Sequence, residues 1–496
     1  MPMSDVLSTT MAINAMQIMP TASAPLIQRG GLQVVVGLGS SGLSAVNYLL
    51  AQGYQVAVTD GGEPKLASML APHVITKFGG IDAELLASAQ RIIISPGIDP
   101  FLPVFHQARE QHIPIVSDIQ LFHEVCHQKN IPIVAITGSN AKSTVTTLVG
   151  NMAHDAGIAV GVGGNLGTPA LELLRAPITL AVLELSSFQL QTTTNLCAQV
   201  ATVLNMSPDH LDRHGDMLGY HQAKHRIFQG VKSIVVNRDD VLSRPLVPDH
   251  TPVISFGSHA PDINQYGLIT DSNGDVWLAR GSQRLLHERD VPIKGQHNLL
   301  NALAALALGE LAGLPLDSML TTLKAFNGLP HRCQFVTTVN INSQAIDCFD
   351  DSKGTNIGST MAAINGLGNV YAPKGKKLAV ILGGQGKGQN FAELAKPIRQ
   401  FVSHVFLIGE DAQKIADDLS KAGLGINNTA GVTFHHCHTM DNAVTGMWQL
   451  AEQSADKASD VGVLLLSPAC ASFDQFSGYN ERGDKFQALV QDTFKR

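Results

Sequence analysis

The stretch Ile131–Gly150 places one lysine in a short polar turn between two apolar runs. The β-branched residues before Gly138 predict a buried strand, and the apolar residues after the turn recur at helical spacing. Such a turn directs backbone N–H groups and the positive end of a helix dipole toward one point, which favours phosphate binding. Lys142 would then reach the β- and γ-phosphates, and the hydroxyl of Ser143 or Thr144 would bind Mg²⁺.

The turn departs from the common phosphate-loop pattern at two positions. That pattern requires glycine immediately before the lysine and again six positions before it, where this chain has Ala141 and Ile136. If residue 141 must adopt a positive φ, alanine costs roughly 1–2 kcal/mol relative to glycine. An ordinary strand-to-helix turn with a solvated lysine therefore remains the alternative.

Two further segments place metal-binding side chains after apolar strands. Glu184 ends the strand within Ile178–Leu190, and His210 lies in the polar segment that follows the strand Ala201–Asn205. A carboxylate at the carboxyl end of a strand in an α/β sheet is a common ligand of Mg²⁺. By itself His210 could equally be a hydrogen-bonded surface histidine, and Lys224, in a later helix, could be a solvated lysine.

A glycine turn occurs near the start of the chain. Gly37, Gly39 and Gly42 form G-x-G-x-x-G between a predicted strand and helix, and Asp60 ends the next strand. Another strand ends at Ser95–Gly97. The first turn favours a nucleotide diphosphate site over a tight packing turn, without identifying the nucleotide.

The helix predicted within Gly295–Gly309 carries Asn298 and Asn301 one turn apart, so their amides share a face. Amides could recognise the edge of a nucleotide base or cap the helix, and spacing alone favours capping for Asn298. Further on, Asp350–Ile357 again places polar groups at the end of a predicted strand. Both segments are candidate binding positions.

Length and composition predict two to four globular domains, with three as the expected number. The 496 residues exceed what one hydrophobic core usually supports. The net charge of -7 and the lack of a lysine/arginine block argue against nucleic acid or an anionic membrane surface as a partner. We expect a loose extension over residues 1–30, a first domain at 31–129, a central domain at 130–330 and a third at 331–496.

Cysteine usage and the N-terminal segment indicate the compartment. The six cysteines are scattered and form no C-x-x-C pair, which suits a reducing environment. No lysine or arginine precedes Arg29, and neither a signal peptide nor a membrane-spanning helix is predicted. We therefore expect a cytoplasmic protein without membrane insertion.

Taken together, the motifs from about Gln33 to the C-terminus resemble those of the Mur ligase family. Six segments carry the resemblance: Thr137–Thr144, Glu184–Gln189, Asp209–Arg213, Gly295–Asn298, Asp351–Asn356 and Ser467–Ser472. The lysine turn of the family is T-G-x-N-G-K-[ST], which accounts for Ile136. Ala141 departs from the family pattern, as does the pair Gly61-Gly62, where relatives commonly have a threonine and an arginine.

The resemblance implies an α/β protein of three domains. These are a Rossmann-like N-terminal domain, a central P-loop-type mononucleotide-binding domain and a Rossmann-like C-terminal domain. It also implies an ATP-dependent ligase that joins D-glutamate to UDP-N-acetylmuramoyl-L-alanine through an acyl phosphate, in the synthesis of the peptidoglycan precursor. ATP and two Mg²⁺ ions are the expected cofactors, the partners are small-molecule substrates, and a monomer is expected.

The same resemblance implies roles for individual residues. The catalytic group comprises Lys142, His210, Lys224, which is expected to be carbamylated, and Asn165. Mg²⁺ would be bound by Ser143, Glu184, His210 and Lys224. ATP would be bound by Gly138, Asn140, Ala141, Lys142, Ser143, Thr144, Asn298, Asn301, Arg332 and Asp351. The UDP-substrate would be bound by Gly37, Gly39, Ser40, Ser41, Asp60, Pro96, Gly97 and Asn165. D-Glutamate would be bound by Lys353, Thr355, Ser472 and Phe473.

Three other classes of protein share parts of this pattern. Folylpolyglutamate synthase has similar central and C-terminal domains but lacks the N-terminal domain with the glycine turn, so residues 33–60 argue against it. An NAD(P)-binding oxidoreductase would use that turn but leaves Lys142, Glu184 and His210 unexplained. A degenerate, non-catalytic binding protein remains an alternative only because of Ala141.

Overall fold

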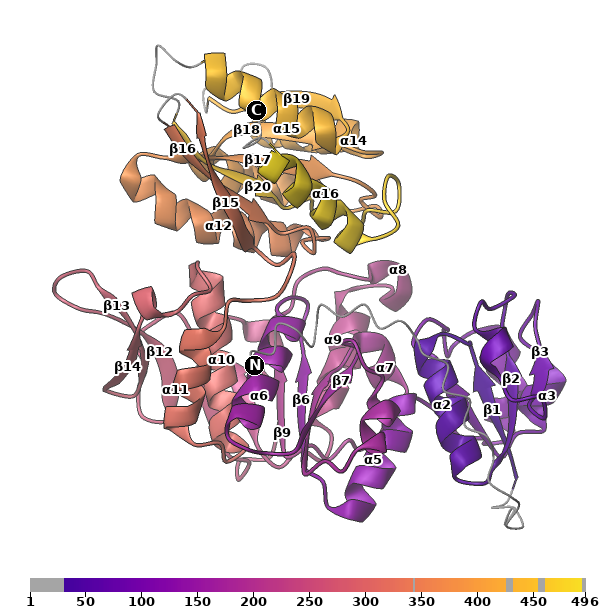
Figure 1. Ribbon diagram of the computed structural model, residues 1–496. Coiled ribbons are helices and arrows are strands. Elements are labelled where there is room, and N and C mark those ends of the chain that lie inside the picture. The colour runs from indigo at the N-terminus through magenta and orange to yellow at the C-terminus, as the bar shows by residue number, and fades with distance from the viewer. Residues whose placement is uncertain (1–30, 342–343, 425–430, 454–459, 493–496) are drawn as a thin grey trace. The chain divides into compact units, whose positions relative to one another are not determined.

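The computed structural model describes residues 31–341, 344–424, 431–453 and 460–492. The expected loose extension, residues 1–30, lies outside the described residues. Packing divides the described chain into two compact units, residues 31–93 with 103–114 and residues 94–102 with 115 onward. The structure contains three sheets, each accompanied by helices (Figure 1).

The first sheet has the strand order β3–β2–β1–β4–β5. β1 (Leu32–Val36) and β2 (Gln55–Thr59) are parallel, and α2 (Ser40–Ala51) connects them, as the glycine-turn pattern predicts. The other elements of this part are β3 (Ile75–Lys77), α3 (Ala83–Ala87), β4 (Arg91–Ile94), α4 (His106–Glu110) and β5 (Ile115–Val116).

The second sheet has nine strands in the order β14–β13–β12–β11–β10–β9–β6–β8–β7. Its strands from β7 to β12 are parallel, and β13 and β14 add an antiparallel edge. The strands are β6 (Ile133–Thr137), β7 (Val160–Gly164), β8 (Leu180–Glu184), β9 (Val200–Val203), β10 (Ile234–Asn237), β11 (Val253–Phe256), β12 (Gln265–Thr270), β13 (Val276–Arg280) and β14 (Gln283–His287). The helices are α5 (Asp118–Lys129), α6 (Lys142–Asp155), α7 (Ser187–Gln191), α8 (Leu211–His214), α9 (Met217–His225), α10 (Gln296–Leu311) and α11 (Leu316–Ala325).

Helix α6 packs on this sheet through the apolar face that its sequence predicts. Val145, Leu148 and Val149 are fully buried in one core, and helices α10 and α11 lie against α6 (Figure 1). Gly150 permits close approach to β7, because a Cβ at that position would lie 2.5 Å from a methyl group of Val162. The helix that follows the lysine turn is therefore held rigidly.

The register of the parallel strands brings their carboxyl ends together. Glu184 pairs with both Ile136 and Gly164, and Thr137 pairs with Val203, so β6, β7, β8 and β9 end at one edge of the sheet. Loops leaving parallel strands at one edge are the usual binding positions of α/β proteins. This register positions most of the candidate site.

The third sheet has the order β15–β16–β20–β17–β18–β19, and only β15 is antiparallel to its neighbour. Its strands are β15 (Gln334–Ile341), β16 (Gln344–Asp350), β17 (Lys377–Gly383), β18 (Val402–Ile408), β19 (Thr433–His438) and β20 (Val461–Leu466). Its helices are α12 (Ile357–Tyr371), α13 (Ala395–Phe401), α14 (Ala412–Leu419), α15 (Met440–Gln453) and α16 (Tyr479–Asp492). The α/β fold class inferred from the sequence is confirmed.

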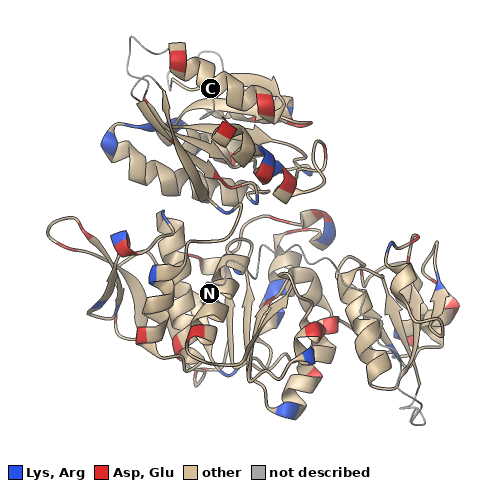
Figure 2. Cartoon of the chain, in the orientation of Figure 1, with Lys and Arg blue, Asp and Glu red and all other residues tan. Residues whose placement is uncertain are grey.

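In the described residues, neither the charged side chains nor the apolar character of the helices marks out one part of the chain. Basic and acidic side chains are interspersed along the described chain (Figure 2). Among the described residues, no helix combines the length and apolar character needed to cross a membrane. All six cysteines are free thiols.

Candidate functional site

The lysine turn connects β6 to α6. Lys142 is the first residue of α6, and its Nζ donates hydrogen bonds to the carbonyl oxygens of Gly138 (2.9 Å) and Ser139 (3.0 Å). Burial lowers the pKa of Lys142, against the opposing effect of the Glu184 and Asp209 carboxylates. The ammonium group is thus held beside the N-terminus of α6, where phosphate oxygens would also be attracted.

Ala141 occupies a position that favours glycine. It is the N-cap of α6 and adopts φ 67° and ψ -4°, in the left-handed region. An L-residue in this region costs roughly 1–2 kcal/mol, because its Cβ approaches the backbone. The condition set by the sequence, that residue 141 needs a positive φ, is therefore met, and the alanine carries local strain.

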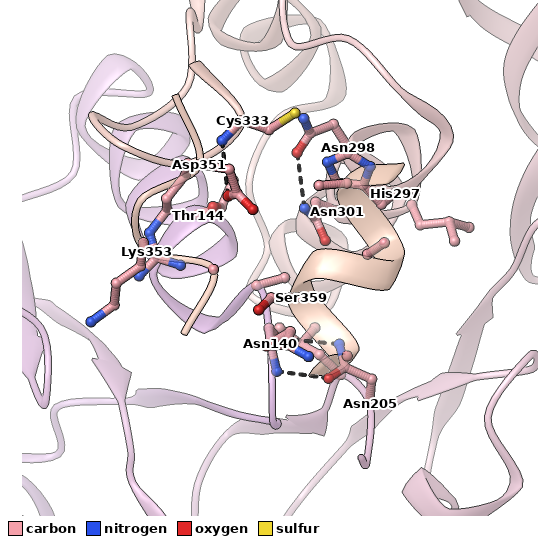
Figure 3. A pocket seen from close by; sticks show the side chains of 18 of the residues that line it. Asn140, Thr144, Asn205, His297, Asn298, Asn301, Cys333, Asp351, Lys353 and Ser359 are labelled. Atoms are coloured by element: carbon pink, nitrogen blue, oxygen red, sulfur yellow. Dashed lines mark hydrogen bonds between the residues drawn. The ribbon is translucent and has the colours of Figure 1, made fainter. Parts of the chain in front are cut away.

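A pair of asparagines ties the turn to the neighbouring strand. The Asn140 N–H donates to Oδ1 of Asn205 (2.8 Å), and Nδ2 of Asn205 donates to the Asn140 carbonyl (3.2 Å; Figure 3). Asn205 follows β9, and no sequence motif marks it as a site residue. Its position at the end of an apolar strand was the available signal.

Glu184 links three side chains that are distant in sequence. Its Oε2 accepts a hydrogen bond from Oγ of Ser143 (2.6 Å), and its Oε1 accepts one from Nδ2 of Asn165 (2.9 Å). Nη2 of Arg332 donates to the same Ser143 hydroxyl (2.7 Å). The carboxylate is 3% exposed. The structure therefore brings four predicted site residues into one hydrogen-bonded chain, which we call the Glu184 chain.

Lys224 is a fully buried lysine next to the lysine turn. Its Nζ donates to the carbonyl oxygen of Gly138 (2.8 Å) and to Oγ1 of Thr137 (3.3 Å), and it lies 4.7 Å from the centre of the Tyr220 ring. Burial, together with the positive charge of Lys142, holds the pKa of Lys224 far below its usual value. The solvated-lysine interpretation is wrong, since the side chain is 1% exposed.

His210 lies at the surface of the same edge. Its side chain is 41% exposed, with Nε2 at 3.7 Å from Oδ2 of Asp209, and its ring packs edge-on against Phe188 at 4.9 Å. Partial burial lowers the pKa of His210, which favours the neutral imidazole that metal ions require.

Two residues at this edge offer oxygen donors of the kind that suits Mg²⁺. Ser143 and Glu184 present a hydroxyl and a carboxylate oxygen 2.6 Å apart, the hard oxygen donors that Mg²⁺ prefers. The guanidinium of Arg332 donates a hydrogen bond to the Ser143 hydroxyl, so a positive charge already lies beside this pair. Within the described ranges, no three or more His, Cys, Asp or Glu side chains are grouped to hold a metal ion.

A cavity of about 330 Å³ opens beside the lysine turn. Figure 3 shows side chains converging on it from the turn, from α10, from the segment around residue 332 and from α12. Its volume lies within the range of small-molecule sites. Its lining includes Asn140, Ala141, Thr144, Asn298, Asn301, Arg332, Asp351 and Lys353.

Asn298 does not cap α10. The N-cap is Gly295, and Nδ2 of Asn298 instead donates to the carbonyl oxygen of Lys294 (2.9 Å). Nδ2 of Asn301 donates to Oδ1 of Asn298 (3.1 Å; Figure 3). The capping interpretation is therefore wrong, because the helix starts two residues before Asn298. Both amides line the cavity.

The segment that enters the third sheet contributes Asp351. Its Oδ2 accepts from Oγ of Ser467 (2.7 Å) and its Oδ1 from the backbone N–H of Cys333 (3.1 Å; Figure 3). Burial raises the pKa of Asp351 to about 7. The carboxyl group is thus held beside Arg332 at one wall of the cavity.

His331 lies next to the candidate site, although no sequence motif marks it as a site residue. Its Nδ1 lies 2.7 Å from Oδ2 of Asp350, and its carbonyl oxygen accepts from the backbone N–H of Lys353 (3.0 Å). This histidine therefore anchors both Arg332 and Lys353. The only signal was its position immediately before the arginine in Gly328–Arg332.

The four residues expected to bind D-glutamate differ in their surroundings. Lys353 lines the cavity, its Nζ lies 4.0 Å from the centre of the Tyr479 ring, and burial lowers its pKa to about 8. Ser472 is buried, Thr355 is half-buried, and Phe473 is 67% exposed. Only Lys353 of the four lies on the described cavity.

The residues expected to bind the UDP-substrate lie on two loops of the first unit and on segments of the second. Gly37 has φ 87°, and α2 begins at Ser40 and Ser41, with Gly39 as its N-cap. Asp60 stabilises this glycine turn, because its Oδ2 accepts from the Leu38 N–H (2.7 Å) and its Oδ1 from the Gly62 N–H (3.0 Å). In the second unit, Pro96 and Gly97 form a turn after β4, and Asn165 belongs to the Glu184 chain.

Comparison with known proteins identifies the family. Three Mur ligase family models match the chain: a MurD-like N-terminal domain at residues 32–117, a middle domain at 136–309 and a glutamate ligase domain at 331–470. A UDP-N-acetylmuramoylalanine–D-glutamate ligase of Psychrobacter arcticus is 62% identical over 475 residues, covering 95% of this chain and 97% of that protein. The ligase of the same name from Acinetobacter baylyi is 56% identical, covering 94% and 99%.

Solved structures agree on the fold. The UDP-N-acetylmuramate-alanine ligase MurC of Thermotoga maritima has a TM-score of 0.56 at 19% identity, with 94% of this chain and all of that chain covered. The three-domain architecture is confirmed, and neither the folylpolyglutamate synthase nor the oxidoreductase alternative is favoured. Family models and full-length relatives together show that this chain belongs to the Mur ligase family.

Proposed function

We propose that the protein joins D-glutamate to UDP-N-acetylmuramoyl-L-alanine, with conversion of ATP to ADP and phosphate. The observation that carries the proposal is the Glu184 chain, which links the lysine turn to Asn165 on one side and to Arg332 on the other. The names of the relatives at 62% and 56% identity support the choice of substrates.

ATP occupies the cavity beside the lysine turn in this proposal. The backbone of the turn and the ammonium of Lys142 bind the phosphates, and Arg332 and Asp351 complete the site from the opposite wall. The amides of Asn298 and Asn301 face the base. The remaining contacts come from Gly138, Asn140, Ala141, Ser143 and Thr144.

Ser143 and Glu184 would hold one Mg²⁺ ion, and His210 and Lys224 would serve a second. When bound, Mg²⁺ would neutralise part of the negative charge on the phosphates during phosphoryl transfer. For the second position we propose that Lys224 is carbamylated. Burial lowers the pKa of its amine, which favours the neutral form that attacks CO₂, and loss of a proton would then leave an anionic oxygen ligand.

The reaction proceeds in two displacements. A carboxylate oxygen of the alanyl group attacks the γ-phosphorus, ADP leaves, and an acyl phosphate forms. The D-glutamate nitrogen then attacks the acyl carbon, phosphate leaves, and the amide forms. Lys142 and Arg332 offset the charge that develops on the transferred group, and Asn165 orients the acyl end through the amide that Glu184 holds.

The two other substrates are assigned by residue type. D-Glutamate carries two carboxylates, so a cation and hydroxyl donors suit it. We assign it to Lys353, Thr355, Ser472 and Phe473. The UDP-substrate is assigned to Gly37, Gly39, Ser40, Ser41, Asp60, Pro96, Gly97 and Asn165.

We also propose the domain boundaries, the oligomeric state and the compartment of the protein. The domain boundaries in this proposal are residues 31–129, 130–330 and 331–496, supported by the family-model matches at residues 32–117, 136–309 and 331–470. The protein acts as a monomer in the cytoplasm and takes small molecules as partners.

Phosphate release tests the proposal directly. The purified protein is incubated with ATP, Mg²⁺ and UDP-N-acetylmuramoyl-L-alanine, and single amino acids are added in turn. Release that depends on D-glutamate is expected, and Lys142→Met is expected to abolish it. Release that is independent of D-glutamate, or faster with another amino acid, would overturn the assignment.

A further inference from the structure

Arg213 of α8 is a largely buried cation to which the proposed reaction gives no role. Its side chain is 13% exposed, and burial lowers the pKa of Arg213. Nη2 donates to the carbonyl oxygen of Ile98 (2.7 Å) and to Oε1 of Gln191 (3.4 Å). Nε lies 3.8 Å from Oδ1 of Asp99 and makes no hydrogen bond within the described part of the chain. Such a guanidinium is costly to bury, so its contacts require a reason.

The contact with Ile98 holds a turn. The Ile98 N–H donates to the carbonyl oxygen of Ser95 (3.0 Å), which closes a β-turn with Pro96 and Gly97 at its centre. The space above Gly97 is open, because a Cβ there would meet no atom within 4 Å. Fixing the Ile98 carbonyl therefore fixes a turn that presents its backbone to open space.

The same guanidinium also packs against an aromatic ring beside His210. Its central carbon lies 5.0 Å from the centre of the Phe188 ring, and this ring packs edge-on against His210 at 4.9 Å. One planar group thus touches both the turn Ser95–Ile98 and the aromatic ring beside His210. Arginine suits this position because its planar guanidinium donates hydrogen bonds within its own plane, while the face of that plane can pack against an aromatic ring.

We propose that Arg213 is a positioning residue that sets the turn Ser95–Ile98, and with it the diphosphate of the acceptor substrate, at the correct place relative to His210. The inference rests on the proposed function, which assigns Pro96 and Gly97 to the UDP-substrate. Arg213 acts through the turn and does not itself touch the reacting atoms. Its loss is therefore expected to weaken use of the acceptor while leaving use of ATP nearly unchanged.

The experiment compares steady-state kinetics of Arg213→Met, Arg213→Lys and a matched control. The control is Arg226→Met, because Arg226 is also an arginine whose pKa is lowered by burial, and it donates to two backbone carbonyls, those of Leu190 (2.7 Å) and Thr193 (2.9 Å). We expect the KM for the acceptor to rise about 10-fold or more in Arg213→Met, with kcat and the KM for ATP within about 2-fold of wild type. Arg213→Lys is expected to recover part of the loss, and Arg226→Met to lower thermal stability without a selective change in the acceptor KM.

The kinetic results distinguish failure of the positioning role of Arg213 from failure of the proposed function. Normal D-glutamate-dependent turnover by the wild type, with an unchanged acceptor KM in Arg213→Met, would overturn the inference alone. Equal increases in both KM values, or the same pattern in Arg226→Met, would show a merely structural role and would also overturn it. Absence of wild-type turnover would remove the proposed function and the inference together.

Discussion

Nη2 of Arg332 donates a hydrogen bond to Oγ of Ser143 at 2.7 Å, across 189 positions of sequence. Ser143 in turn donates to Glu184 (2.6 Å). A guanidinium from the segment before the third sheet therefore neutralises the hydroxyl–carboxylate pair to which we assign Mg²⁺. In the catalytic state the same cation is expected to act on the γ-phosphate.

Replacement of Arg332 tests this relationship. Arg332→Met is expected to lower kcat/KM for ATP about 10- to 100-fold, because a hydrogen bond from a charged donor is lost in a buried site. Phosphate release at varied ATP concentration gives the measurement. Arg399→Met, at an exposed arginine of α13, is the control and should leave kcat/KM unchanged. Equal activity of the two variants would contradict the assignment.

Relief of backbone strain at Ala141 is the second prediction. Because φ is 67°, Ala141→Gly is expected to raise the free energy of unfolding by about 0.5–1 kcal/mol, the strain being partly offset by the greater freedom of glycine in the unfolded chain. Urea unfolding measures the change. Ala156→Gly, at the other end of α6 where φ is -78°, should instead destabilise the protein. A loss of stability in Ala141→Gly would show that alanine is tolerated there without strain.

Replacement of glutamate by glutamine is expected to have different effects at the buried Glu184 and at the half-buried Glu310. Glu184→Gln removes the charge of a residue to which we assign Mg²⁺, so the Mg²⁺ concentration needed for half-maximal phosphate release should rise at least about 10-fold. Glu310→Gln removes the charge that pairs with Arg280 and leaves one acceptor oxygen for the hydrogen bonds that Arg280 and Tyr266 donate, so it should lower the free energy of unfolding by about 1–2 kcal/mol with normal Mg²⁺ dependence. An unaltered Mg²⁺ requirement in Glu184→Gln would exclude Glu184 as a ligand.

The folded protein is expected to lose stability in acid because His297 is buried in its neutral form. Burial lowers the pKa of His297 from 6.5 to about 4, and its ring packs against Gly295 and Gly366. The unfolded chain therefore binds a proton that the folded chain does not, so the stability from neutral His297 is present above pH 6.5 and is lost as pH falls toward 4. The contribution amounts to at most about 3 kcal/mol.

Urea unfolding between pH 7 and pH 4 measures this effect. The slope of the unfolding free energy against pH should be shallower in His297→Gln than in the wild type, by up to one proton. His73→Gln, at an exposed histidine, controls for the substitution itself. An identical slope in His297→Gln and the wild type would show that His297 does not titrate in the folded protein below its ordinary range.

Local patterns in the sequence determined the secondary structure of the site. The lysine turn lies between β6 and α6, and the glycine turn lies between β1 and α2, because burial of β-branched runs and helical spacing of apolar residues are properties of short segments. Glu184 was found for the same reason, since a carboxylate that ends an apolar run must lie at the end of a strand. The ordered motifs also sufficed to indicate the family.

Tertiary structure decided which of these groups meet. The pairing of Glu184 with Ile136 and Gly164 depends on the parallel register, and the Arg332–Ser143 contact depends on packing between distant segments, neither of which short-range periodicity encodes. The same holds for Asn298, whose amide binds the Lys294 carbonyl because the chain turns at Gly295. The lysine turn was recognisable as a sequence, but the positive φ of Ala141 and the burial of Lys224 beside it follow only from the sheet edge against which the turn folds.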